Sequence, residues 1–227
     1  MPTSTVEDYV KHILMEEQRQ GEALVPMGRI AAALNVTPST VTAMVKTLAD
    51  SGLVTYEPYS GVRLTPAGRK LAAHVLRRHR LLEVFLVQVV GLNWSEVHAE
   101  AEQLEHAVSE RVIDRIDELL GRPAVDPHGD PIPSAAGVVS ELDFPSLLLC
   151  GLGSPLRVER VSDQSTDFLR LVERSGLVPG SVLSVASRDE MAETVQLRLE
   201  SGREVSLGWR AAAKILVQPL GAAMRVS

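Results

Sequence analysis

The chain has 227 residues, 45% of them hydrophobic, and a formal net charge of −6, which allows one large core or two or three smaller domains. Its single cysteine, Cys150, excludes an internal disulfide framework and a zinc site built from cysteines. The longest apolar runs are far shorter than the roughly 20 residues of a membrane-spanning helix. No signal-peptide pattern is present, so we expect a cytoplasmic protein without a membrane partner.

The first third of the chain predicts a winged helix-turn-helix. Thr37 is a good N-cap, and Pro38 suits the first position of the helix that follows. In this motif that helix enters the major groove of DNA. The alternative is a generic helical bundle with one hairpin. Apolar spacing and turn residues place the elements, in the order helix, helix, helix, strand, strand and helix, at residues 6–20, 25–34, 38–51, 53–57, 62–65 and 67–86.

The middle of the chain is acidic and helical. Residues 81–140 hold eleven Asp and Glu against three Lys and Arg, whereas residues 1–80 hold seven against ten. This asymmetry suggests that the first part faces phosphates and the second faces cations. Residues 94–120 also carry an apolar stripe long enough for a symmetric dimer interface. The stripe consists of Val97, Ala101, Leu104, Val108, Val112 and Ile116.

The last third changes to a β pattern after a Pro- and Gly-rich connection at residues 121–151. One short helix is expected at residues 166–174, within a small barrel of about five strands. The strands are predicted at residues 157–161, 182–187, 194–199, 204–207 and 215–217. The fold class is therefore mainly α with a small all-β domain. The expected division is 1–73 for DNA binding, 74–140 for metal binding and dimerisation, 141–152 as a linker, and 153–227 for the β domain.

Four potential metal ligands line one face of the acidic helical region. His98, Glu102, Glu105 and His106 are spaced i, i+4, i+7 and i+8, and imidazoles and carboxylates in convergent positions bind metals. A second pair, His79 and Glu83, lies one helical turn apart upstream. The alternative is a solvated acidic helix with a surface histidine.

Several motifs resemble the diphtheria-toxin-repressor family, which includes iron-sensing and manganese-sensing branches. They span residues 1 to about 135, and a weaker match, at Val178-Pro179-Gly180-Ser181 and in the strand pattern, resembles the family's SH3-like domain. The motifs are Arg29-Ile30-Ala31, Thr40-Val41, Leu64-Thr65-Pro66-Ala67-Gly68-Arg69, Arg78-His79-Arg80-Leu81-Leu82-Glu83, Val97-His98, Glu102-Gln103-Leu104-Glu105-His106 and Asp130-Pro131-Ile132-Pro133.

The resemblance implies a homodimeric repressor that binds double-stranded operator DNA when loaded with a divalent metal and controls metal homeostasis. It implies a primary metal site that joins the first helix to the dimerisation region. The residues at those positions are Asp8, Glu102, Glu105 and His106. It also implies an ancillary site completed by the SH3-like domain. The residues at those positions are His79, Glu83 and His98, with Gln164 and Asp167 as the added ligands and Asp163 as the substitute.

Departures from the family pattern bear on the identity of the metal. The iron-sensing branch has two sulfur ligands where this chain has Asp8 and Glu102, and carboxylates favour Mn²⁺ over softer ions, with Fe²⁺ as the alternative. Manganese sensors often add an acid one turn after Asp8, where this chain has Lys11, which argues against a two-metal cluster. Asp126-Pro127-His128-Gly129 resembles a Cys-Pro-His-Gly metal element of long manganese regulators. Asp126 and His128 are thus candidate ligands, or His128 caps a turn.

The expected recognition helix is rich in hydroxyl side chains. These can bond phosphates, and threonine methyls can touch the thymine methyl. The candidate DNA contacts are Thr37, Pro38, Ser39, Thr40, Thr42, Lys46 and, in the wing, Arg63.

Two other functions fit parts of the pattern. A metalloenzyme such as a binuclear hydrolase would use the same ligands around an open position for water, although no nucleophile motif accompanies them. A winged-helix regulator that senses a small organic molecule would need no metal at all. Titration of operator binding with Mn²⁺, Fe²⁺ and a chelator separates these functions.

Overall fold

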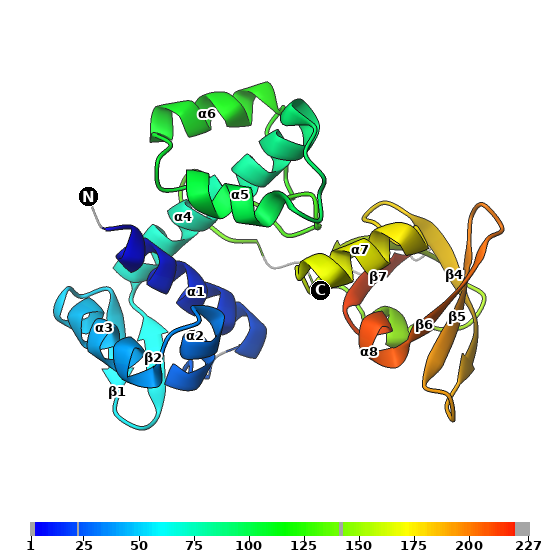
Figure 1. Ribbon diagram of the computed structural model, residues 1–227, viewed down its shortest axis with the longest axis horizontal. Coiled ribbons are helices and arrows are strands. Elements are labelled where there is room, and N and C mark those ends of the chain that lie inside the picture. The colour runs from blue at the N-terminus through cyan, green and yellow to red at the C-terminus, as the bar shows by residue number, and fades with distance from the viewer. Residues whose placement is uncertain (1–2, 22, 141–142, 221–227) are drawn as a thin grey trace.

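The computed structural model describes residues 3–21, 23–140 and 143–220 and consists of two helical units and a β unit (Figure 1). Residues 141–142 of the expected linker lie outside the described residues. In the described part of the chain, every helix is too short or too polar to cross a membrane.

The first unit is the expected winged helix-turn-helix. It contains α1 (Ser4–Gln20), α2 (Met27–Ala33), α3 (Pro38–Asp50), the antiparallel hairpin of β1 (Val54–Glu57) and β2 (Gly61–Leu64), and the start of α4 (Pro66–Phe85). Thr37 and Thr65 cap α3 and α4 through their side chains, and each is followed by a proline in the first helical position. Val10, Ile13, Val41 and Val45 lie in a shared core that holds α1 against α3.

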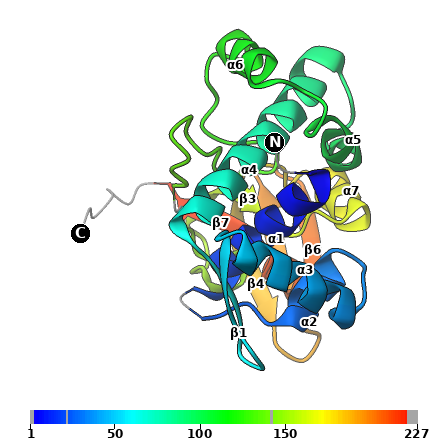
Figure 2. The ribbon, with the colours of Figure 1, turned by 90° about the vertical axis from the view of Figure 1, so that its left-hand side faces the viewer.

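Helix α4 belongs to two cores. Its first half contributes Ala72 and Leu76 to the winged-helix core, and its second half contributes Leu81 and Leu82 to the core of the next unit. Figure 2 shows α4 running from the hairpin toward α6. The expected domain boundary at residue 73 thus falls inside a continuous helix, which couples the two units mechanically.

The acidic region forms two helices instead of the single stretch expected at residues 94–120. After a π-helical turn at Leu86–Val90 come α5 (Val97–Leu104) and α6 (Glu110–Leu119). The predicted dimer stripe is divided, because its members Val97, Ala101 and Ile116 are buried in the core of this unit. On α6, its member Val112 is 48% exposed, and Leu119, which was not in the stripe, is 67% exposed. These two apolar side chains leave the outer face of α6 suited to an interface.

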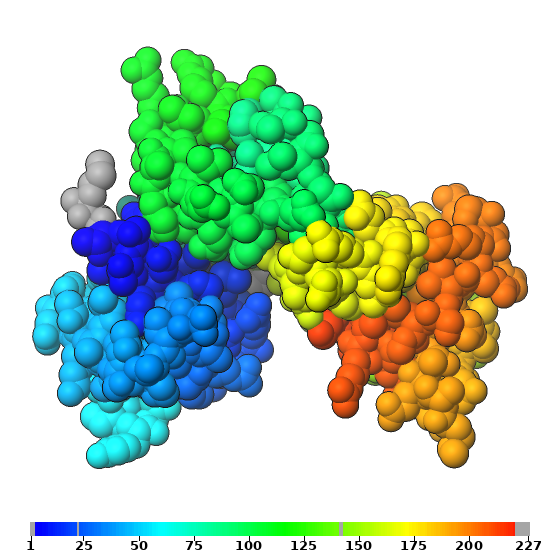
Figure 3. Space-filling view, viewed as in Figure 1, coloured from blue at the N-terminus to red at the C-terminus, as the bar shows by residue number. Residues whose placement is uncertain are grey.

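The C-terminal unit is a five-stranded antiparallel sheet in the order β6-β5-β4-β3-β7. All five predicted strands form, and α7 lies where a helix was expected. Figure 3 shows this unit beside the two helical units, with the yellow α7 segment adjoining them. The elements are η2 (Leu147–Leu149), β3 (Pro155–Val161), α7 (Thr166–Ser175), β4 (Val182–Asp189), β5 (Thr194–Leu199), β6 (Glu204–Gly208), α8 (Trp209–Ala212) and β7 (Ile215–Pro219).

A buried loop joins the β unit to α4. Asp126 accepts hydrogen bonds from the backbone N–H groups of His128 and Asp130, which closes the loop. The His128 carbonyl then accepts from the Val161 N–H at 2.9 Å, and Asp130 accepts from the Gln164 side chain at 2.7 Å. This loop therefore fixes the β unit beside the acidic clusters of α4 and α5.

Candidate metal centre

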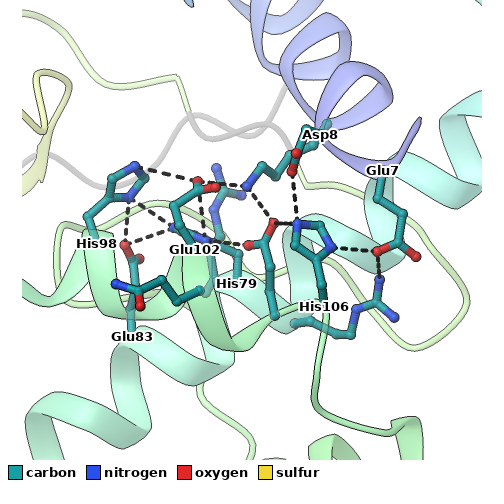
Figure 4. Close-up of polar contacts among 12 residues, drawn as sticks. Glu7, Asp8, His79, Glu83, His98, Glu102 and His106 are labelled. Atoms are coloured by element: carbon teal, nitrogen blue, oxygen red, sulfur yellow. Dashed lines mark hydrogen bonds and ion pairs between the residues drawn. The ribbon is translucent and has the colours of Figure 1, made fainter. Parts of the chain in front are cut away.

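Side chains from α1, α4 and α5 meet in a continuous cluster of carboxylates and imidazoles (Figure 4). Asp8, Glu105 and His106 form a first group, whose ligand atoms lie within 4.8 Å of one another. His106 Nε2 is 2.8 Å from Asp8 Oδ1 and 3.4 Å from Glu105 Oε1. His106 can turn toward α1 because α5 ends at Leu104, so the break in the acidic region is what directs this ligand.

The ring of His106 is oriented by Glu7, a residue that the sequence analysis missed. Glu7 Oε2 lies 2.7 Å from His106 Nδ1 and 2.9 Å from an Arg78 nitrogen. Burial lowers the pKa of His106, but the hydrogen bond to Glu7 and the charges of Glu105 and Asp8 raise it more. With Nδ1 directed at Glu7, Nε2 faces the first group, as expected of a histidine ligand held by an outer carboxylate.

The fourth predicted primary ligand, Glu102, is paired with Lys11 and does not join the first group. Lys11 Nζ is 2.7 Å from Glu102 Oε1 and 2.6 Å from Glu105 Oε1, and the lysine side chain is 1% exposed. Burial lowers the pKa of Lys11, but the two carboxylates raise it above its usual value, so the ammonium is charged. The structure thus brings Glu102 beside Lys11 and His79 and outside the Asp8 group.

A second group contains the three predicted ancillary ligands of the helical unit. His79 Nε2 is 3.0 Å from both Glu83 Oε1 and His98 Nδ1. The other nitrogen of His79 lies 2.6 Å from Glu105 Oε2, which links this group to the first. Burial lowers the pKa of His79, but the charge of Glu83 and the hydrogen bonds to Glu105 and Glu83 raise it to about 9.

A third group, Glu83, Asp126 and His128, is fully buried and carries unpartnered polar atoms. Glu83 Oε2, Asp126 Oδ2 and His128 Nδ1 have no hydrogen-bond partner among the described residues, and Asp126 Oδ2 has only a longer ion-pair contact of 3.7 Å with Arg80 Nε. His128 Nε2 lies 3.0 Å from the Trp94 carbonyl oxygen, an acceptor only, so Nε2 carries the proton and Nδ1 is directed at Glu83. Buried atoms of this kind are rare without a partner. This donor set therefore fits a divalent cation.

Protons compete with a cation for the third group. Burial, with the neighbouring carboxylates of Asp130 and Glu83, raises the pKa of Asp126 to about 7. Burial lowers the pKa of His128, but the neighbouring carboxylates of Glu83 and Asp126 raise it to about 9. The group therefore retains protons near neutral pH, and a bound cation would displace them.

The ligands expected from the SH3-like domain are placed differently from one another. Gln164 lines a cavity of about 500 Å³ together with His79, Glu83 and His98, although its amide N–H donates to Asp130. Asp163 lines the same cavity and is paired with Lys214 at 2.5 Å. Asp167 lies in the first turn of α7 and is exposed, away from the three groups. Asp167 does not line the cavity, because α7 begins at Thr166 and places this position on the solvent side.

Comparisons with known proteins agree with this architecture. Two family models of iron-dependent repressors match the chain. The model of the N-terminal DNA-binding domain matches residues 1–62, and the model of the metal-binding and dimerisation domain matches residues 65–134. A FeoA domain matches residues 146–219. The HTH-type transcriptional regulator MntR of Geobacillus thermodenitrificans is 41% identical over 120 residues, which are 53% of this chain and 83% of the relative.

A longer match comes from the iron-dependent repressor IdeR of Mycobacterium leprae, which is 35% identical over 201 residues, covering 80% of this chain and 83% of the relative. The chain belongs to the diphtheria-toxin-repressor family. A solved structure described as a manganese-dependent transcriptional repressor in complex with manganese superposes with a TM-score of 0.86 at 40% identity, covering 95% of this chain and 100% of that chain. The apo form of the manganese-activated repressor ScaR superposes with a TM-score of 0.77 at 32% identity, covering 94% and 100%. The family and fold class that the sequence motifs predicted are confirmed.

The candidate DNA face of this family member lies on α3 and the wing. Ser39, Thr40 and Lys46 are exposed on α3, and Arg63 is exposed on β2. The Thr37 hydroxyl is shared with Ser39 and Thr40 in the helix cap, and Thr42 donates to the Pro38 carbonyl at 2.8 Å. The hydroxyls of Thr37 and Thr42 therefore have local partners, and Pro38 serves α3 as its first residue.

Proposed function

We propose that this chain is a homodimeric transcriptional repressor that binds operator DNA when loaded with Mn²⁺, with Fe²⁺ as the alternative metal. The observation that carries the proposal is the group formed by Asp8, Glu105 and His106. Asp8 lies on α1 of the DNA-binding unit, whereas the other two lie at the end of α5. A cation there would add a second link between α1 and the end of α5, beside the ion pairs that Lys11 makes with Glu102 and Glu105.

Manganese is supported by the chemistry of the donors. The three groups contain only carboxylate oxygens and imidazole nitrogens. Hard oxygen donors suit Mn²⁺, whereas sulfur donors would favour softer ions. The single cysteine, Cys150, packs in the core of the β unit.

The residues of α1 explain how a metal could control DNA binding. When bound, the ion supplies positive charge that offsets the mutual repulsion of the carboxylates. Asp8 then holds the start of α1 against α5, and α1 packs through Val10 and Ile13 on the core that carries α3. A shift of α1 is therefore passed to the recognition helix, and the metal selects one of two arrangements by differential affinity.

The dimer places two recognition helices on one DNA molecule. The exposed Val112 and Leu119 of α6, with Val89 and Val90 of the π-helical turn, provide apolar surface for a second copy. A two-fold axis through this surface would set the two α3 helices to read successive major grooves, roughly 34 Å apart. In this proposal the chain acts in the cytoplasm, where the operator is.

The relatives are named as regulators, which weighs against the binuclear hydrolase. The three ligand groups weigh against a sensor of organic molecules, because that function would not require them.

The test is Asp8→Ala, with Glu190→Ala as a control acid that is exposed on the β unit. Operator binding is measured by fluorescence anisotropy against Mn²⁺ concentration, with size-exclusion chromatography to confirm the dimer. We expect Asp8→Ala to lose the response to Mn²⁺ by at least about tenfold, an order consistent with a coupling of 1–3 kcal/mol. Glu190→Ala should respond like the wild type. Operator binding that stays fully Mn²⁺-dependent in Asp8→Ala would refute the proposed bridge.

A further inference from the structure

Two candidate cation positions share one carboxylate. Asp8, Glu105 and His106 surround the first position, and His79, Glu102 and Glu105 surround the second. Glu105 is common to both and is 0% exposed. Positions that share a ligand in this way are the arrangement of a paired metal site.

The second position already holds a positive charge that belongs to the chain. Lys11 Nζ lies 2.6 Å from Glu105 and 2.7 Å from Glu102, the two carboxylates of that group. The lysine side chain is 1% exposed. Lys11 lies three residues after Asp8, so α1 presents a ligand to the first position and a cation to the second.

We propose that the ammonium of Lys11 permanently occupies the second position, so that the primary site takes one divalent ion and never a pair. This inference rests on the proposed function only in requiring that the Asp8 group binds metal. Lys11 is therefore a residue that determines stoichiometry and does not itself bind the metal.

A charge balance supports the proposal. Asp8, Glu102 and Glu105 together carry three negative charges, which one divalent ion and one ammonium neutralise. A second divalent ion would leave a large excess of positive charge in a site where Lys11 and Glu105 are screened from water, and such an excess is costly. A glutamate in place of Lys11 would make four negative charges, which two divalent ions neutralise.

Direct metal counting with Mn²⁺ alone tests the inference. Equilibrium dialysis and elemental analysis give the number of ions per subunit for the full chain, Asp8→Ala, Lys11→Glu, Lys11→Met and the exposed control Lys70→Glu. We expect Asp8→Ala to bind one ion fewer than the wild type, and Lys11→Glu to bind one more. Lys70→Glu should match the wild type.

Electron paramagnetic resonance then reports whether two ions share a ligand. Lys11→Glu should show the broadened spectrum of a coupled Mn²⁺ pair that the wild type lacks. Lys11→Met removes the charge without adding a ligand, so Mn²⁺ should bind to the Asp8 group at least about tenfold more tightly because a neighbouring cation is gone. Circular dichroism verifies that each variant is folded. If Lys11→Glu does not fold, the Mn²⁺ affinity of Lys11→Met tests the inference in its place.

The outcomes separate this inference from the proposed function. A coupled pair in the wild type, the loss of two ions in Asp8→Ala, or unchanged Mn²⁺ affinity in Lys11→Met would overturn the role of Lys11 and leave the metal-dependent function intact. A folded Lys11→Glu variant that gains no ion would do the same. An Asp8→Ala variant that loses no ion would overturn the primary site, and the inference with it.

Discussion

Replacement of Gly129 by alanine should detach the buried loop from the β unit. Gly129 has φ of +88°, and a Cβ atom at this position would lie 2.0 Å from the Glu159 carbonyl oxygen and 2.8 Å from the Arg160 Cα. Both neighbours are backbone atoms, so no side chain can rotate away. The loop must move by more than about 1 Å to restore van der Waals contact.

The cost has two parts that a matched control separates. An alanine at positive φ is strained by roughly 1–2 kcal/mol. Gly180 has φ of +90° and open space around it, so Gly180→Ala has the strain without the clash. Gly129→Ala additionally breaks the hydrogen bond from Val161 to His128 and displaces Asp130 from Gln164, at about 1 kcal/mol each. We therefore expect Gly129→Ala to be less stable than Gly180→Ala by at least about 2 kcal/mol.

Urea unfolding followed by tryptophan fluorescence measures this difference. The chain has two tryptophans, and the Trp94 ring lies 5.3 Å from the His128 ring, beside the loop that must move. In a Trp209→Phe background, Trp94 alone reports on that loop. Unfolding free energies for Gly129→Ala and Gly180→Ala that agree within about 0.5 kcal/mol would show that the loop yields freely, contrary to this reasoning.

Three further predictions follow from particular contacts. Glu17→Ala should lower the free energy of unfolding by about 1–3 kcal/mol, because Glu17 accepts a hydrogen bond from the buried Leu64 N–H at 2.8 Å. Glu17→Gln keeps an acceptor and should lower it less. Equal losses for the two variants in urea unfolding would contradict this. Lys46→Ala should weaken binding to every DNA sequence alike and reduce the salt slope by about 1 if the exposed Lys46 contacts one phosphate, as anisotropy titrations at several salt concentrations would reveal. Mn²⁺ at a hundred times its dissociation constant should add about 2.7 kcal/mol per site to the unfolding free energy, and a chelator should remove that gain in thermal melts; identical melting curves with and without Mn²⁺ would argue against binding to the folded state.

Local patterns predicted most of the elements. Thr37-Pro38 and Thr65-Pro66 mark helix starts through capping chemistry that involves only neighbouring residues, and both helices begin there. Alternating apolar residues predicted all five strands of the β unit, because alternation is also a property of residues close together in the chain. The acidic region was harder, because its apolar spacing continues through residues 105–109, where the chain leaves the helix.

The sequence by itself determined which residue types are available as ligands, and motif spacing placed His79 beside Glu83 on a single helix. It did not determine their partners, because partners such as Glu7 with His106, or Lys11 with Glu102, are more than ninety residues apart in the chain. Only the tertiary structure brings α1 against α5, and only there does a lysine become a buried cation between two carboxylates. The physical reason is that helix periodicity is a local property, whereas the charge at a site is the sum over every element that packs around it.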